Sequence, residues 1–249
     1  MRAAGEYRSV GLLVGRDGLC TATLVAPQVV LTARHCSIVV PESFCIQGEG
    51  PEGNDCAETD FGRSVLERWG GAGQCPSGGD MHLIHLKTPI TSVRPLSVDD
   101  VTVVPNAVCD VVGYGGSDLE HVEATVGRLK IVESAGSGLR GIGVDGHTDV
   151  GDSGGPVICD GKLAAITSCG LPGSEEGWYV ATQPFHRWLR ETIADWSRAA
   201  ECARFDMRCE HPADHDEMWS CDDFGHWKLS RSCPVNHCYV NGNQAGCPD

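Results

Sequence analysis

The sequence lacks several features that would assign it to a large class of proteins. No apolar run approaches the roughly 20 residues that a helix needs to cross a bilayer, so we expect no membrane-spanning segment. Basic residues are scarce: 19 lysines and arginines stand against 34 aspartates and glutamates, a formal net charge of −15. This balance argues against nucleic acid and anionic membranes as partners. The first 18 residues contain only a short, interrupted apolar stretch, unlike a signal peptide.

Cysteine, in contrast, is abundant. The chain has 14 cysteines in 249 residues, and such usage is typical of an oxidising compartment, where disulfides persist. We therefore expect a secreted or periplasmic protein with an export segment upstream of the numbered chain. Hydrophobic residues make up 41% of the sequence, enough for a sizeable core, and the length fits one large domain or a domain with a small module.

Helical patterns are rare as well. Short runs rich in Val, Ile, Leu and Thr, separated by Gly, Pro and Asp, recur through the first 180 residues and predict an all-β sandwich or barrel. One amphipathic helix is expected at about 184–198, where Pro184 suits the first turn. Residues 201–249 hold six cysteines and few aliphatic side chains, which predicts a disulfide-stapled module. Six cysteines allow 15 pairings, and the sequence does not choose among them.

The stretch HTDVGDSGGPVICDG, residues 147–161, surrounds Ser153 with Gly151, Gly154 and Gly155. A serine hydroxyl is a weak nucleophile unless a base lies beside it. Attack on a carbonyl also requires donors for the oxygen that gains charge, and backbone N–H groups on a tight turn supply them without obstructing side chains. The pattern favours a nucleophilic serine over the alternative, an ordinary serine in a glycine-rich hairpin.

Three motifs carry a resemblance to a known family. GDSGGP resembles the nucleophile motif of the trypsin/chymotrypsin-like serine proteases, LTARHC their histidine motif, and GGDMHLIHLK the segment with their buried aspartate. The motifs occur in the family's order, and the resemblance covers about residues 5–198. It implies a protease domain over residues 1–200, with two six-stranded antiparallel β-barrels at about 1–95 and 96–183 and a cleft between them.

The resemblance also implies the roles of individual residues. Ser153 would be the nucleophile, His35 its base, and Asp80 the carboxylate that orients the imidazole and stabilises its charged form. The N–H groups of Gly151 and Ser153 would form the oxyanion hole. Ser168 matches the serine that helps to hold the aspartate.

Nearby residues offer alternatives. Asp60 competes with Asp80 for the carboxylate role, but no apolar strand follows Asp60, whereas one follows Asp80. His82 and His85 lie in that strand and are expected to be structural or surface residues. Arg34 stands where a small residue normally precedes the histidine, and we expect its side chain to turn to solvent because an isolated buried charge is expensive.

The specificity and activation of the site follow from the same resemblance. His147 would lie at the floor of the specificity pocket beside Thr148, with Gly170 and Gly177 keeping the walls open. Because an aspartate there would favour Lys or Arg substrates and His147 replaces it, we expect a different specificity. Asp152 would be the partner of a new amino terminus, yet the chain has no Ile-Val-Gly-Gly-like start for that step.

Four disulfides are expected. The resemblance implies Cys20–Cys36 and Cys109–Cys159; we add a local Cys45–Cys56 bridge and an unusual Cys75–Cys169 crosslink over the substrate groove, with two free thiols as the alternative to the last.

No metal or cofactor is expected. The acidic loop at residues 45–60 is a candidate calcium site, with a simple solvated loop as the alternative, and the tail histidines lack the spacing of zinc ligands.

The sequence therefore predicts a monomeric serine endopeptidase that acts on peptides or proteins through an acyl-enzyme. The alternatives are an impaired homologue that serves as a binding module and an esterase that uses the same residues. The tail would bind substrate, a surface or a partner, or simply resist proteolysis.

Overall fold

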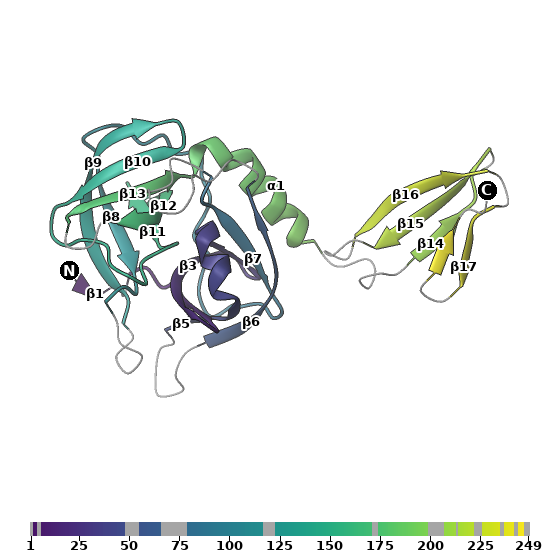
Figure 1. The fold of residues 1–249 in the computed structure, drawn as a ribbon, viewed down its shortest axis with the longest axis horizontal. Coiled ribbons are helices and arrows are strands. Elements are labelled where there is room, and N and C mark those ends of the chain that lie inside the picture. The colour runs from purple at the N-terminus through teal and green to yellow at the C-terminus, as the bar shows by residue number, and fades with distance from the viewer. Residues whose placement is uncertain are drawn as a thin grey trace. The chain divides into compact units, whose positions relative to one another are not determined.

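The computed structural model describes residues 2–3, 6–47, 55–65, 79–116, 123–170, 174–198, 207–212, 214–221, 226–234, 237–241 and 244–246. The chain divides into two compact units, an N-terminal unit (Met1–Ala194) and a C-terminal unit (Asp195–Asp249). Figure 1 shows the strands and the helix of these units.

The first barrel of the N-terminal unit is built from short strands joined by tight turns. Two residues join the first strand pair, the shortest common hairpin connection. The six strands close in the order β2-β3-β4-β7-β6-β5. They are β2 (Val10–Gly15), β3 (Gly18–Ala26), β4 (Val29–Thr32), β5 (Pro41–Ile46), β6 (Asp55–Ser64) and β7 (His82–Leu86). A 3-10 helix, η1 (Arg34–Val39), follows β4.

The second barrel is also antiparallel and six-stranded. Its strands run in the order β9-β10-β13-β12-β11-β8, and the pairing of β8 with β9 closes the barrel. They are β8 (Val108–Gly113), β9 (Thr125–Ala135), β10 (Gly138–Gly143), β11 (Pro156–Cys159), β12 (Lys162–Gly170) and β13 (Glu176–Ala181). The predicted pair of barrels is confirmed. The short β1 (Arg2–Ala3) pairs with β9, so the beginning of the chain joins the second sheet rather than the first barrel.

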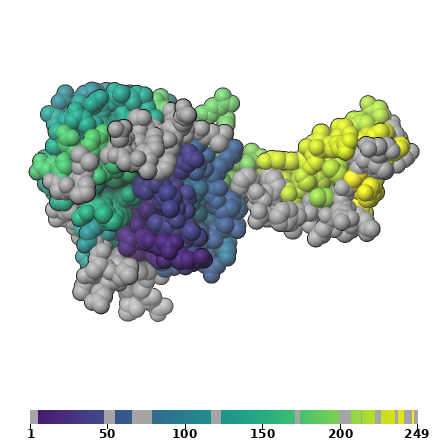
Figure 2. Space-filling model, viewed as in Figure 1, coloured from purple at the N-terminus to yellow at the C-terminus, as the bar shows by residue number. Residues whose placement is uncertain are grey.

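The two barrels share an apolar interface that fixes the cleft between them. Val10 and Leu12 of the first barrel pack in one cluster with Val112, Tyr114 and Ile158 of the second. Figure 2 shows the purple and blue segments of the first barrel directly against the teal and green segments of the second. Because this contact is buried, side chains contributed by opposite barrels keep a constant separation.

Among the described residues, one α-helix lies at the end of the N-terminal unit and runs two residues beyond Ala194. The 3-10 turn η2 (Gln183–Phe185) leads into α1 (His186–Trp196), which confirms the predicted helix. Leu189 and Trp196 are buried on one face, as the amphipathic pattern requires. Among the described residues, no helix combines the length and the apolar character needed to cross a membrane.

The C-terminal unit is built from small antiparallel sheets with few aliphatic residues. Three strands, β14 (Met207–Glu210), β15 (Asp216–Cys221) and β16 (Trp227–Cys233), form one sheet. Two more, β17 (Tyr239–Asn241) and β18 (Gln244–Gly246), form a hairpin. A disulfide joins Cys209 to Cys238, and Cys221 and Cys233 are buried and disulfide-bonded. Crosslinks thus supplement a small core.

Polar contacts organise the same unit. The Asp216 carboxylate is 1% exposed and accepts hydrogen bonds from the backbone N–H groups of His237 and Cys238 at 2.8 and 2.9 Å. The Arg208 guanidinium lies 4.4 Å from the ring centre of Trp227 and 5.5 Å from that of Trp219. These contacts anchor the hairpin and the sheet through directional interactions.

A buried histidine marks the pairing of β6 with β7. His82 is 8% exposed, and its Nδ1 lies 2.8 Å from the Ser64 hydroxyl oxygen. A Cβ at Gly62 would overlap the other ring nitrogen, so only glycine leaves room for the ring. Burial, and secondly the charge of Arg34, lower the pKa of His82 to about 4. His82 is therefore neutral and structural at neutral pH.

This histidine should make stability depend on pH. An unfolded histidine has a pKa near 6.5, so the unfolded chain takes up a proton more readily than the folded one between pH 6.5 and 4. Above pH 6.5 the free energy of unfolding has its full value. It falls by about 3 kcal/mol as the pH drops from 6.5 to 4. We expect His82→Gln to remove this part of the acid destabilisation. Urea unfolding at pH 7 and pH 4.5 measures it, and an equal loss in variant and wild type would contradict the assignment.

Candidate active site

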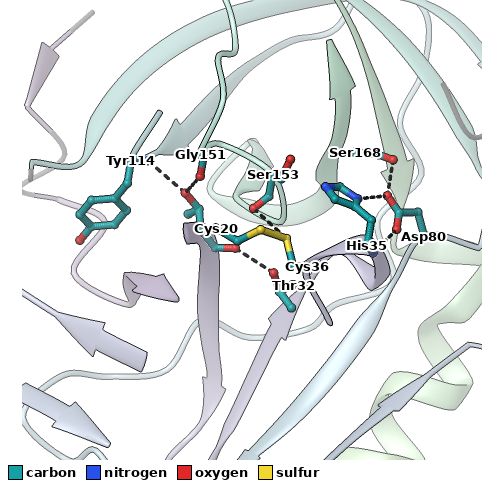
Figure 3. Close-up of a disulfide and its surroundings, with 10 residues drawn as sticks. Cys20, Thr32, His35, Cys36, Asp80, Tyr114, Gly151, Ser153 and Ser168 are labelled. Atoms are coloured by element: carbon teal, nitrogen blue, oxygen red, sulfur yellow. Dashed lines mark hydrogen bonds and ion pairs between the residues drawn. A yellow bond between two sulfur atoms is a disulfide. The ribbon is translucent and has the colours of Figure 1, made fainter. Parts of the chain in front are cut away.

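A buried carboxylate and an imidazole form the best-defined polar pair of the N-terminal unit. Asp80, just before β7, is fully buried, whereas the His35 side chain at the start of η1 is 26% exposed. The His35 backbone N–H donates to Asp80 Oδ1 at 2.9 Å, and its Nδ1 lies 2.8 Å from Oδ2 (Figure 3). The Ser168 hydroxyl on β12 also donates to Oδ2, at 2.5 Å. Donors from two distant segments therefore satisfy one carboxylate.

The protonation state of Asp80 follows from these contacts. Burial by itself would raise the pKa of Asp80. The hydrogen bond and charge of His35, with the Ser168 and backbone donors, outweigh burial and hold the pKa below its ordinary value. Asp80 is thus ionised at neutral pH and acts as an acceptor towards His35 Nδ1.

Ser153 lies on a tight turn of the second barrel that only glycines can form. Gly151 and Gly154 have φ angles of +103° and +82°, a region that side chains other than glycine rarely occupy. A Cβ at Gly154 would also overlap the Thr32 hydroxyl oxygen, which belongs to the first barrel. Steric constraints therefore explain why glycines stand on either side of the serine.

Two backbone N–H groups of this turn, in residues that line a cavity, lack a hydrogen-bond acceptor among the described residues. In the described part of the chain, the backbone N–H groups of Gly151 and Ser153 donate to no protein acceptor. Both residues line a cavity of about 440 Å³ that His35 also lines. Figure 3 shows the Ser153 side chain beside the His35 ring, and no hydrogen bond joins the two within the described structure. Such bonds are often long before substrate binds.

The predicted pocket residues divide into two groups. His147, Thr148 and Gly170 line the same cavity. Gly177 is not among the lining residues, and a Cβ there would overlap the hydroxyl of Tyr179, so this glycine makes room for a neighbouring side chain. The lining also includes residues that sequence reasoning missed: Leu19, Val39, Asp149 and Val150. Val150 is 87% exposed at the rim.

The Asp152 carboxylate is satisfied by the backbone. It is 7% exposed, and its oxygens accept the N–H groups of Gly115 and Asp149, each at 2.7 Å. A Cβ at Gly113 or Gly115 would overlap the carboxylate. Burial, and secondly the negative charge of Asp149, raise the pKa of Asp152 despite these two donors.

Three disulfides occur at the expected pairs of the N-terminal unit: Cys20–Cys36, Cys45–Cys56 and Cys109–Cys159. The first ties β3 to η1 beside the cavity, and the carbonyl oxygen of Ser153 lies 3.6 Å from Cys36 Sγ. Cys169 lines the cavity and is disulfide-bonded. Its predicted partner, Cys75, lies outside the described residues, so that pairing stays a prediction.

The alternative charged residues lie elsewhere. Asp60 approaches His85, with 3.5 Å between Oδ2 and Nδ1, and does not contact His35. Arg34 is half-buried rather than turned fully to solvent, and its charge acts on His82 instead of on Asp80.

Among the described residues, one group of potential metal ligands lies close together. The cluster found there comprises Cys20, His35 and Cys36, and its two cysteines form a disulfide and offer no thiolate. Glu49 and Glu52 of the acidic loop lie outside the described residues. Its described carboxylates contact other side chains of the chain: Asp55 with Ser92, Glu58 with Lys87, and Asp60 with His85. Calcium binding stays a prediction.

Comparisons with known proteins identify the family of the chain. The Trypsin family matches residues 2–189. The venom plasminogen activator Haly-PA of Gloydius brevicauda is 29% identical over 222 residues, covering 76% of this chain and 83% of that protein. The snake venom serine protease rhinocerase 4 of Bitis rhinoceros is 26% identical over 230 residues, with shares of 76% and 83%.

Solved structures share the fold. Human heparin binding protein superposes with a TM-score of 0.65 at 17% identity, covering 81% of this chain and 98% of that one. At this identity the likeness concerns the fold alone. The family match spans most of the sequence, including all three motifs, and the chain belongs to the trypsin family of serine proteases.

Proposed function

We propose that the protein is a serine endopeptidase in which Ser153, His35 and Asp80 form the catalytic triad. The observation that carries this proposal is the hydrogen bonding of the fully buried Asp80 carboxylate to His35, whose side chain lines the same cavity as Ser153 and Gly151. The first half of the reaction needs a base that is held in one tautomer, and the Asp80–His35 contact meets that need.

In the first half of the reaction, Ser153 Oγ attacks the carbonyl carbon of the scissile bond. His35 Nε2 accepts the hydroxyl proton, and Asp80 stabilises the imidazolium that forms. The carbonyl oxygen becomes an oxyanion that accepts the N–H groups of Gly151 and Ser153. As the tetrahedral intermediate collapses, the C–N bond breaks and His35 gives its proton to the leaving amine.

In the second half, water replaces the amine. His35 takes a proton from the water, whose oxygen attacks the acyl-enzyme carbonyl. Collapse of the second tetrahedral intermediate breaks the ester bond, and His35 returns the proton to Ser153 Oγ. The net reaction is hydrolysis of one peptide bond with no cofactor consumed.

For specificity, we propose that the pocket does not prefer Lys or Arg. His147, which the resemblance assigns to the floor, lines the cavity with an exposed side chain and carries no negative charge. Asp149 is the carboxylate of the lining; it is exposed and accepts the N–H of Val150 at 2.7 Å. Solvent screens such an exposed charge, so its attraction for a basic side chain is weak. Cleavage of a peptide library mainly after Lys or Arg would contradict this.

The other expectations remain proposals. Disulfides in both units and the venom relatives support a protein that works outside the cytosol, on peptide or protein substrates. We also expect the protein to be a monomer and the C-terminal unit to have a binding role.

A fluorophosphonate probe tests the proposed function directly. We expect the wild type to be labelled at Ser153 and to hydrolyse peptide substrates. Ser153→Ala should lose labelling and reduce kcat by about 10⁴–10⁶-fold, because the nucleophile is gone while binding remains. Peptide mass mapping locates the label, and circular dichroism of the variant checks its fold.

An unlabelled but folded wild type would instead support the binding module. The observation that favours this alternative is the missing hydrogen bond between Ser153 and His35 in the described structure. Hydrolysis of esters without cleavage of peptides would favour an esterase.

Ser168 should support the triad through Asp80. Ser168→Ala removes a hydrogen bond to the ionised carboxylate, so we expect the free energy of unfolding to fall by about 1.5–3 kcal/mol. The pKa of Asp80 should rise because one donor to its charged form is lost. Ionised Asp80 contributes stability at neutral pH, and on acidification the variant should lose this contribution at a higher pH than the wild type does. Urea unfolding across pH measures both.

The rate separates this role from ordinary packing. We expect kcat to fall in Ser168→Ala, by less than the roughly 10⁴-fold lost when the triad carboxylate becomes an amide. Thr182→Val is the matched control: its hydroxyl is fully buried and bonds the carbonyl groups of Leu163 and Ala164. It should reduce stability and leave kcat unchanged. A Ser168→Ala enzyme with unchanged kcat would contradict the role.

A further inference from the structure

We propose that Thr21 is a positioning residue that holds the turn bearing Gly151 and Ser153 in the geometry of an oxyanion hole. The inference rests on the proposed function and assigns a role to a residue outside the triad. Thr21 lies on β3 of the first barrel and is fully buried, whereas the turn belongs to the second barrel.

Three hydrogen bonds of Thr21 reach the second barrel. Its hydroxyl donates to the Gly151 carbonyl oxygen at 2.8 Å and accepts the backbone N–H of Tyr114 at 3.0 Å. Its own backbone N–H donates to the Ser153 carbonyl oxygen at 2.9 Å. Figure 3 shows Tyr114, Gly151 and Ser153 gathered around the Cys20 end of β3. One residue therefore engages the carbonyl groups of both Gly151 and Ser153.

These contacts restrain the direction of the Ser153 N–H. The carbonyls of Gly151 and Ser153 belong to the peptide groups on either side of the group that carries the Ser153 N–H. Because each peptide group is planar, holding the two outer groups leaves the middle one little freedom. Glycine has access to conformations on both sides of φ = 0, so the turn at Gly151 needs such a restraint.

Thr21 is itself tied to the segment that carries the base. Its carbonyl oxygen accepts the Thr32 hydroxyl at 2.9 Å, and Thr32 ends β4 just before η1 and His35. The preceding residue, Cys20, forms the disulfide with Cys36. The same short stretch of β3 thus links the histidine segment to the serine turn across the cleft.

The Thr21 contacts act beside those of Asp152. Asp152 accepts the N–H groups of Gly115 and Asp149 and restrains the turn from within the second barrel. The Thr21 hydroxyl restrains the turn from the first barrel, and it carries no charge at any pH of interest. The geometry of the oxyanion hole therefore does not depend on Asp152 alone.

Thr21→Val tests the role, since it replaces the hydroxyl by a methyl group of similar size. We expect kcat to fall by about ten-fold or more with little change in KM, because the lost geometry matters in the transition state and less in substrate binding. The affinity of a peptide boronate, which forms a tetrahedral adduct with the serine, should fall in parallel. Thr21→Ser keeps the hydroxyl and should restore both quantities.

Thr23→Val is the matched control. Thr23 lies two residues along the same strand and is also fully buried, but its hydroxyl has no hydrogen-bond partner. Removing an unsatisfied buried hydroxyl should leave kcat and boronate affinity unchanged and should not reduce stability. If Thr21→Val does not fold, Thr21→Ala and Thr21→Ser replace it, and the difference between these two isolates the hydroxyl.

The outcomes separate the inference from the proposed function. A wild type that labels at Ser153 and turns over peptides, with Thr21→Val reduced in stability but unchanged in kcat and boronate affinity, would overturn the inference alone. A folded wild type without labelling or turnover would overturn the proposed function and the inference with it.

Discussion

The hydrogen bonds of the buried Asp80 carboxylate are the interaction on which the site depends. An ionised carboxylate without water is expensive unless donors surround it. Here the donors come from His35 in the first barrel and Ser168 in the second. The charge therefore stays in place only if both barrels keep their relative position. In return it holds the imidazole in one orientation, which a base for the serine hydroxyl requires.

The apolar contact between the barrels and the polar contacts across the cleft have separate effects. Val10, Leu12 and Ile158 bury surface and hold the barrels together. Directional hydrogen bonds, such as those of Thr21, then fix the orientation of the turn around Ser153. Neither would suffice alone, because apolar packing is not directional and a few hydrogen bonds cannot assemble two barrels.

The two units are stabilised in different ways. The N-terminal unit buries aliphatic side chains in two closed barrels, so its disulfides add to an existing core. The C-terminal unit has small sheets, and its buried residues include Cys221 and Cys233, with polar anchors such as Asp216. A small domain with little apolar surface to bury needs such crosslinks to remain folded.

Local patterns in the sequence indicated the fold class, and the resemblance of three motifs to a known family indicated the segments that carry the site. Strand periodicity and turn residues predicted an all-β sandwich or barrel and the helix near Pro184. The motif resemblance added the two barrels and the candidates His35, Asp80 and Ser153. The tertiary structure alone decided that His82 is buried and neutral, that Gly177 accommodates Tyr179, and that Thr21 holds the Gly151 turn. The reason is distance along the chain: Thr21 and Gly151 are 130 residues apart, and no local pattern records which buried hydroxyl will meet which carbonyl.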